Sequence, residues 1–314
     1  MSGRTSAGLL KVRAIRPGSR VALVAPASAF DRDQFPAGLA EVKRLGLEAV
    51  YDDNLFDRNP LNAGPAASRA RALQRAFDQL DVDAVVCVRG GYGSLELLPL
   101  LDANRIRRSR TAFVGYSDVT AVHSYLGATV GLTSVYGAMV EGRLAKGAAA
   151  YDARTFWQCL TAEPLGELMP EGVEIVTGGE ATGPLVGGTL TQLVASFETP
   201  FAFRPPDHHV LLIEDVGERP YRLHRMLTQW RMSGRLATTV AVVLGQFPEC
   251  EEPGGSITAL DVMRECFRDF PGPVLYGFPF GHTTTPLISL PLGVRARVVA
   301  HGTPRLVVEE AAAE

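Results

Sequence analysis

Short, continuous apolar runs alternate with stretches of helical periodicity through the first half of the chain. The apolar runs, which predict buried strands, lie at 21–25, 84–88 and 112–115. The stretches with helical spacing lie at 33–45, 65–80, 94–101 and 117–126. Continuous apolar strands that alternate with helices are typical of a parallel sheet covered on both faces. Residues 1–150 are therefore predicted to form an N-terminal α/β domain.

The pattern loosens after residue 150. A helix is expected at 151–160, and residues 161–183 are polar with prolines and glycines, so 151–183 is predicted to be an interdomain segment. Residues 184–314 then form a C-terminal domain. Its expected helices lie at 190–196, 219–232 and 257–270, and its expected strands at 210–213, 240–244, 274–278, 287–290, 294–299 and 305–308. Polar alternation in the last three predicts antiparallel strands, so this domain should mix helices with a mixed or antiparallel sheet.

Composition excludes several classes of function. The net charge is −3 and the basic residues are dispersed, unlike the clustered basic surface of a nucleic-acid-binding protein. Cys87, Cys159, Cys250 and Cys266 form no Cys-x-x-Cys pair and adjoin no histidine cluster, which predicts reduced thiols in a cytoplasmic protein and no metal site. No apolar run approaches the roughly 18 residues of a membrane span, and no targeting segment is recognised.

A serine follows one of the predicted strands. In Gly115-Tyr116-Ser117-Asp118 a buried strand meets a helix, and a serine at such a turn is lifted out of the sheet. The backbone N–H of Asp118 and the helix N-terminus would then favour an oxyanion beside it. The second glycine of a Gly-x-Ser-x-Gly elbow is missing, so Ser117 could also be a simple helix N-cap.

A glycine-rich loop follows a second strand, as Arg89-Gly90-Gly91-Tyr92-Gly93. Its glycines let the backbone approach a ligand and expose N–H groups, so the N–H of Gly91 is a candidate for the other oxyanion donor. Arg89 could hold a substrate carboxylate or brace the loop. The loop matches neither a P-loop nor a dinucleotide fingerprint, and a purely structural turn stays open.

A carboxylate and a histidine complete the candidate chemistry. Glu214 ends a buried strand, where its charge is costly unless it is paired. His282 lies in a glycine turn, whereas the other histidines have structural explanations. A serine hydroxyl becomes nucleophilic when a histidine removes its proton and a carboxylate orients that histidine. No spacing rule ties Ser117, Glu214 and His282 together.

These residues lie in segments that resemble the LD-carboxypeptidases, a serine peptidase family that includes the microcin C self-immunity peptidases. The segments follow the family's order and span nearly the whole chain. They are Val-Ala-Leu-Val-Ala-Pro-Ala-Ser at 21–28, Arg-Gly-Gly-Tyr-Gly at 89–93, Gly-Tyr-Ser-Asp at 115–118, Gly-Gly-Thr-Leu-Thr-Gln-Leu at 187–193, Leu-Ile-Glu-Asp-Val-Gly-Glu at 212–218, Tyr-Arg at 221–222 and Gly-His at 281–282.

The resemblance implies a role for each residue. Ser117 would be the nucleophile, His282 the general base, and Glu214, rather than Asp215 or Glu218, the charge-relay acid. The active site would lie between the α/β domain and the C-terminal domain of a homodimer that needs no metal or cofactor. The implied reaction cleaves an L-to-D peptide bond and releases terminal D-alanine from cytoplasmic murein tetrapeptides during peptidoglycan recycling.

Substrate-binding candidates are Arg89, Gly90, Tyr92 and Thr189. The family more often has asparagine where this chain has Thr189, so specificity here could differ. Residues 161–183 contain no aromatic side chain of the kind with which microcin-immunity members stack a nucleotide base. Hydrolysis of peptidyl or aminoacyl nucleotides is the alternative activity. A second alternative is a non-catalytic small-ligand binding protein, in which Glu214 would pair with an arginine.

Overall fold

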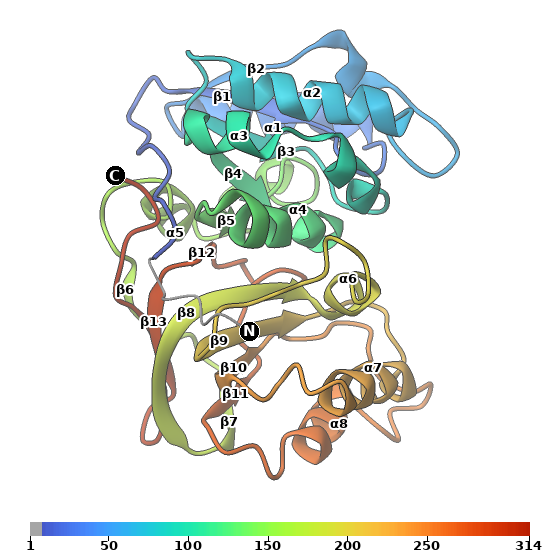
Figure 1. Ribbon diagram of the computed structural model, residues 1–314, viewed down its shortest axis with the longest axis vertical. Coiled ribbons are helices and arrows are strands. Elements are labelled where there is room, and N and C mark those ends of the chain that lie inside the picture. Colours follow the sequence, from blue (N-terminus) through green and yellow to red (C-terminus); the bar gives the residue numbers. More distant parts are fainter. Residues whose placement is uncertain (1–7) are drawn as a thin grey trace.

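The structure is a computed structural model that describes residues 8–314. In Figure 1, the first half of the chain forms the upper part of the molecule and most of the second half forms the lower part. The described residues contain a six-stranded sheet, β12-β5-β4-β3-β1-β2, and an eight-stranded sheet, β6-β14-β13-β8-β9-β10-β11-β7. The predicted fold class is confirmed, with one mostly parallel sheet and one mixed sheet.

The first sheet is parallel except where β12 pairs antiparallel with β5. Its central strands are apolar and buried along their full length, as strands covered on both faces must be. The strands are β1 (Arg20–Val24), β2 (Glu48–Val50), β3 (Ala84–Cys87), β4 (Ala112–Gly115), β5 (Ser134–Tyr136) and β12 (Leu290–Leu292).

Helices follow the strands of this sheet as the periodicity predicts. In α2, Ala70, Leu73 and Phe77 repeat at helical spacing and are buried, so one stripe of the helix faces the core. The helices are α1 (Phe35–Arg44), α2 (Ala66–Asp78), α3 (Ala103–Ser109), α4 (Thr120–Tyr125) and α5 (Ala153–Gln158), with short turns η1 (Arg32–Gln34), η2 (Asp53–Phe56), η3 (Ser94–Leu100), η4 (Ser117–Val119), η5 (Leu126–Val130) and η6 (Leu144–Lys146).

In the second sheet, β8, β9, β10 and β11 run parallel, and the strands on either side pair antiparallel. The strands are β6 (Gly166–Leu168), β7 (Glu174–Thr177), β8 (Gly179–Thr189), β9 (His209–Glu214), β10 (Thr239–Leu244), β11 (Val274–Tyr276), β13 (Arg295–Ala300) and β14 (Arg305–Val308). The helices are α6 (Leu190–Ala195), α7 (Pro220–Met232) and α8 (Ala259–Cys266).

Residues 161–183 differ from the expected irregular connection, because they form β6, β7 and the first part of β8. β6 and β7 are short strands at the two edges of the sheet and are partly exposed, so they lack the apolar run that marks a buried strand. β12, late in the chain, joins the first sheet. The expected domain limits at 150 and 183 stay a prediction.

The carboxyl ends of parallel strands bring the candidate residues together. Tyr136, the last residue of β5, lies opposite Gly115 at the end of β4, and Thr189 at the end of β8 lies opposite Glu214 at the end of β9. Gly188 lets the two sheets approach, since a Cβ there would come within 2.6 Å of Oγ1 of Thr120 in the first half. Crevices at the carboxyl ends of parallel strands are the usual ligand sites of α/β folds.

Candidate active site

Ser117 is the first residue of η4, at the sharp turn that follows β4. Its φ of 69° falls in the left-handed region, which a non-glycine residue enters at a cost of about 1–3 kcal/mol and which is common at active sites. Tyr116 occupies the N-cap position and no side-chain cap hydrogen bond is present, so the N-cap interpretation of Ser117 is wrong. The serine is partly exposed, although the strand before it and the helix after it are buried. The turn therefore leaves the serine partly accessible to solvent.

The glycine loop packs directly against this serine. A Cβ at Gly90 would lie 2.8 Å from Cβ and 3.0 Å from Oγ of Ser117, so only glycine fits without displacing the serine. Gly91 has a φ of 105° and lies against Ser28. Within residues 8–314, the backbone N–H groups of Gly91 and Asp118 contact no hydrogen-bond acceptor. Both predicted oxyanion donors are thus unoccupied by the protein's own groups.

Two buried side chains hold the loop in place. The Asp118 carboxylate accepts hydrogen bonds from the N–H groups of Gly93 at 3.3 Å and Ser94 at 2.8 Å. Arg69 donates to the carbonyl oxygen of Gly93 at 2.8 Å and to carbonyl oxygens of two neighbouring loops. Burial raises the pKa of Asp118, although the hydrogen bonds from Ser94 and Gly93 oppose that rise. The carboxylate therefore braces the loop while its backbone N–H remains free.

Glu214 is fully buried and accepts four hydrogen bonds. Oε1 accepts from the hydroxyls of Tyr136 and Thr189, both at 2.6 Å, and Oε2 accepts from the backbone N–H of His282 at 2.8 Å and from its Nδ1 at 2.7 Å. Burial acts to raise the pKa of Glu214, but the charge of His282 and these hydrogen bonds outweigh it and lower the pKa. A carboxylate surrounded by four donors is held ionised.

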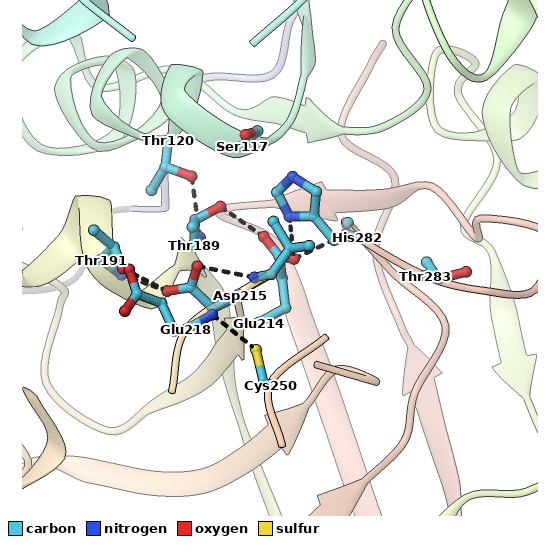
Figure 2. A network of polar contacts seen from close by, with 12 residues as sticks. Ser117, Thr120, Thr189, Thr191, Glu214, Asp215, Glu218, Cys250, His282 and Thr283 are labelled. Carbon is cyan, nitrogen blue, oxygen red and sulfur yellow. Dashed lines mark hydrogen bonds and ion pairs between the residues drawn. The ribbon is translucent and has the colours of Figure 1, made fainter. Parts of the chain in front are cut away.

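His282 is oriented by that carboxylate. Because an ionised carboxylate only accepts, Nδ1 must carry a proton, and the lone pair of the neutral ring is on Nε2. Figure 2 shows the ring with one nitrogen at Glu214 and its opposite edge turned toward the turn that carries Ser117. Burial acts to lower the pKa of His282, yet the charges of Glu214 and Asp215 and the hydrogen bond raise it. The imidazole is therefore poised as a base.

The structure brings the three predicted residues close together. The ring of Tyr116, which precedes the serine, lies 5.1 Å from the ring of His282 in an edge-on contact. The hydrogen bonds of residues 8–314 do not include one between Oγ of Ser117 and His282. Catalytic hydrogen bonds often form only in the substrate complex, so this geometry is that of a free enzyme. Glu214 pairs with a histidine, not with the arginine that a non-catalytic protein would favour.

The predicted substrate-binding residues fall into two groups. Arg89 and Tyr92 are exposed beside the glycine loop, and Arg89 donates to the carbonyl oxygen of Ala29 at 2.9 Å and lies 3.7 Å from Glu141. Thr189, in contrast, is 5% exposed, and its hydroxyl donates a hydrogen bond to Glu214. The contacts of Thr189 support the acid and leave its hydroxyl no free proton for a substrate.

Sequence reasoning missed Tyr136 and Arg143. The Tyr136 hydroxyl donates to Glu214 and accepts from the backbone N–H of Ser117 at 3.3 Å. Arg143 donates to the carbonyl oxygens of Gly281 and Thr283, at 3.3 and 3.0 Å, on both sides of His282. Neither belongs to a local motif, so the sequence held no signal for them.

Other kinds of site find little support. In the part of the chain that the structure describes, no group of three or more His, Cys, Asp or Glu side chains could hold a metal ion. None of the helices between residues 8 and 314 has the length and apolar character needed to cross a bilayer. Burial raises the pKa of the thiols of Cys87 and Cys159 well above the ordinary range, which keeps both unreactive.

Comparison with known proteins identifies the family of the chain. Residues 21–137 match the model of the LD-carboxypeptidase N-terminal domain, and residues 182–298 match that of the LD-carboxypeptidase C-terminal domain. A murein tetrapeptide carboxypeptidase of Pseudomonas aeruginosa is 31% identical over 270 residues, which cover 84% of this chain and 88% of that protein.

Solved structures show the same fold. The crystal structure of a muramoyltetrapeptide carboxypeptidase from Oxalobacter formigenes is similar with a TM-score of 0.82 at 27% identity, covering 93% of this chain and all of that one. The structure of MccF in complex with glutamyl sulfamoyl guanosine is similar with a TM-score of 0.88 at 21% identity, covering 96% and 99%. The resemblance found in the sequence motifs is confirmed, and the chain belongs to the LD-carboxypeptidase family.

Proposed function

We propose that this carboxypeptidase is a serine enzyme that hydrolyses an L-to-D peptide bond and releases terminal D-alanine from murein tetrapeptides. Ser117 is the nucleophile, His282 the general base and Glu214 the acid that orients it. Family membership and the murein tetrapeptide carboxypeptidase of Pseudomonas aeruginosa support this choice of substrate. We further propose that the enzyme acts in the cytoplasm, in peptidoglycan recycling, as a homodimer, as the resemblance to the family implies.

The reaction follows the chemistry of other Ser-His-acid peptidases. Nε2 of His282 takes the proton of the Ser117 hydroxyl as Oγ attacks the carbonyl carbon. The N–H groups of Asp118 and Gly91 stabilise the resulting oxyanion. The imidazolium then protonates the amine of D-alanine as the C–N bond breaks, and water hydrolyses the acyl-enzyme in a second cycle with the same base. Glu214 remains ionised throughout.

One observation carries the proposal: the buried carboxylate of Glu214 accepts the Nδ1 proton of a histidine that adjoins a strained, accessible serine turn. Burying a carboxylate is costly unless it is hydrogen-bonded, and here Glu214 accepts four hydrogen bonds. A pair of this kind does little for stability that apolar residues would not do better. Its arrangement is suited to the activation of a nucleophile.

Release of free D-alanine from L-Ala-γ-D-Glu-diamino acid-D-Ala tests the proposal. The wild type should release it, Ser117→Ala should lose at least about 10³-fold in kcat, and Ser233→Ala, a serine at the end of α7, should retain full activity. The same peptide ending in L-alanine should be a poor substrate. Equal activity in wild type and Ser117→Ala would refute the assigned nucleophile. Hydrolysis of aminoacyl sulfamoyl nucleotides without action on the tetrapeptide would refute the assigned substrate.

A further inference from the structure

A tyrosine that the proposed mechanism does not use lies at the centre of the site. Tyr136 ends β5 in the first sheet and is completely buried. Its hydroxyl donates to Oε1 of Glu214 at 2.6 Å and accepts from the backbone N–H of Ser117 at 3.3 Å. A tyrosine hydroxyl can donate one hydrogen bond, and here it donates that bond to Glu214. One oxygen atom thus contacts both the turn of the nucleophile and the acid.

The position of this hydroxyl follows from the register of the two sheets. Tyr136 is opposite Gly115, two residues before the serine, and its hydroxyl reaches the backbone N–H of Ser117. Thr189 on the second sheet meets the same carboxylate oxygen, and its hydroxyl lies 2.9 Å from that of Tyr136. The backbone N–H of Thr189 donates to Oγ1 of Thr120 at 3.1 Å. The contact between the sheets is therefore built around Oε1 of Glu214.

We propose that Tyr136 is a positioning residue that fixes Ser117 and Glu214 relative to one another, with Thr189 as the second donor that holds the carboxylate. It acts through these two residues and does not contact the reacting atoms. The assignment rests on the proposed function, because it takes Ser117 and Glu214 as members of one catalytic site. It gives Thr189 a role in orienting the acid, distinct from the substrate contact expected at that position.

Tyr136→Phe removes only the hydroxyl. The backbone N–H of Ser117 loses its hydrogen-bond acceptor, and Oε1 of Glu214 loses one of its two donors. The carboxylate then attracts the proton of His282 more strongly through Oε2. The kcat for D-alanine release should fall about 10–100-fold while KM changes less than about threefold. The charged or titratable groups that set the pKa of His282 are Glu214, Asp215 and Arg143. Because Glu214 then attracts the imidazolium form more strongly, the ascending limb of the pH profile of kcat/KM should move to higher pH.

Tyr151→Phe is the matched control. Tyr151 is also buried and also donates its hydroxyl proton to a glutamate, Oε1 of Glu41 at 2.5 Å, outside the site. The Tyr151→Phe variant should have the same kcat, and the same ascending limb in its pH profile of kcat/KM, as wild type. Thr189→Val should resemble Tyr136→Phe, and Thr189→Ser, which keeps the hydroxyl, should restore activity. A Tyr136→Phe enzyme with the kinetics of Tyr151→Phe would overturn the proposal.

A readout independent of turnover separates the two proposals. The pKa of His282 can be followed by NMR of the imidazole in wild type, Tyr136→Phe and Tyr151→Phe, with His282→Ala to assign the signal. An upward shift confined to Tyr136→Phe supports the positioning role even if murein peptides prove not to be the substrate. Normal turnover of the tetrapeptide by wild type, with an unshifted His282 in Tyr136→Phe, would leave the function intact and refute the role of Tyr136.

Discussion

Substitution of Glu214 by glutamine tests the electrostatic part of the site. The amide has the same shape but offers one acceptor oxygen and one NH2 donor. The backbone N–H of His282 is a fixed donor, so the amide oxygen must take the place of Oε2. The NH2 group then faces the hydroxyls of Tyr136 and Thr189, which can rotate to accept. The Nδ1 proton therefore stays in place, and the variant loses charge without losing the tautomer.

The size of the effect follows from the separation of the charges. During catalysis His282 becomes an imidazolium whose Nδ1 lies 2.7 Å from Oε2 of Glu214. Unit charges centred about 4 Å apart, at an effective dielectric constant of about 20, attract by about 4 kcal/mol. Loss of that attraction in the transition state corresponds to about 10³-fold in kcat. Loss of the carboxylate also leaves burial as the main influence on His282, so its pKa should fall and the ascending limb should move to lower pH.

Steady-state release of D-alanine by Glu214→Gln, measured from about pH 5 to 9, checks both parts because His titrates in this range. Asp215→Asn is the matched control: Asp215 is also buried, but its oxygens accept from Thr191 and Val216 and do not contact His282. It should cost less than about tenfold in kcat, because only a more distant charge is lost. The reasoning is refuted if Glu214→Gln keeps kcat within about tenfold of wild type, or if its limb moves to higher pH than that of wild type.

Four further outcomes are expected. Gly90→Ala should abolish activity while the fold survives, because its Cβ would lie 2.8 Å from Cβ of Ser117, and circular dichroism together with D-alanine release measures both. The raised pKa of His282 places the ascending limb of wild-type kcat/KM above pH 6.5, the ordinary value, and a limb below it would contradict this sign. The depressed pKa of Glu214 stabilises the folded state above pH 4.5, and this stabilisation is lost in acid. The raised pKa of His282 stabilises the folded state below pH 6.5, and this stabilisation is lost in base. The difference in melting temperature between wild type and Glu214→Gln should therefore be largest between these two pH values. Arg143→Met should lower kcat about tenfold with little change in KM, since the loop of His282 loses two donors, and unchanged kcat would exclude that role.

The sequence predicted those parts of the fold that have a strong local signal. β3, β4, β9 and β10 are continuous apolar runs, and each was located to within about two residues, the usual uncertainty of a boundary. β6 and β7 were missed because short edge strands are stabilised by pairing with β14 and β11, and this pairing leaves no mark in their own composition. In the first sheet β2 and β5 were missed as well, and because β5 ends at Tyr136, which donates to Glu214, the sequence also offered no reason to place that residue at the site.

The site was predictable to the same extent. Ser117 and His282 lie in glycine turns, and Glu214 ends a buried strand, so each is unusual in its own segment. Tyr136 is an ordinary aromatic residue at the end of an apolar strand, where a place in the core is the natural expectation. Its contacts with Ser117 and Glu214 exist only because β5 lies beside β4 and the second sheet meets both. No pattern along the chain contains that information.

Convergence on one carboxylate also couples the assembly of the site to the docking of the two sheets. Oε1 of Glu214 accepts one hydrogen bond from Tyr136 in the first sheet and another from Thr189 in the second, while Oε2 accepts two from His282. If the sheets separated by even one hydrogen-bond length, the buried carboxylate would lose the donor that Tyr136 of the first sheet supplies. The charge of Glu214 therefore favours the docked arrangement in which Ser117 and His282 lie close together. The cost of burying that charge is offset only when both halves of the chain contribute their donors.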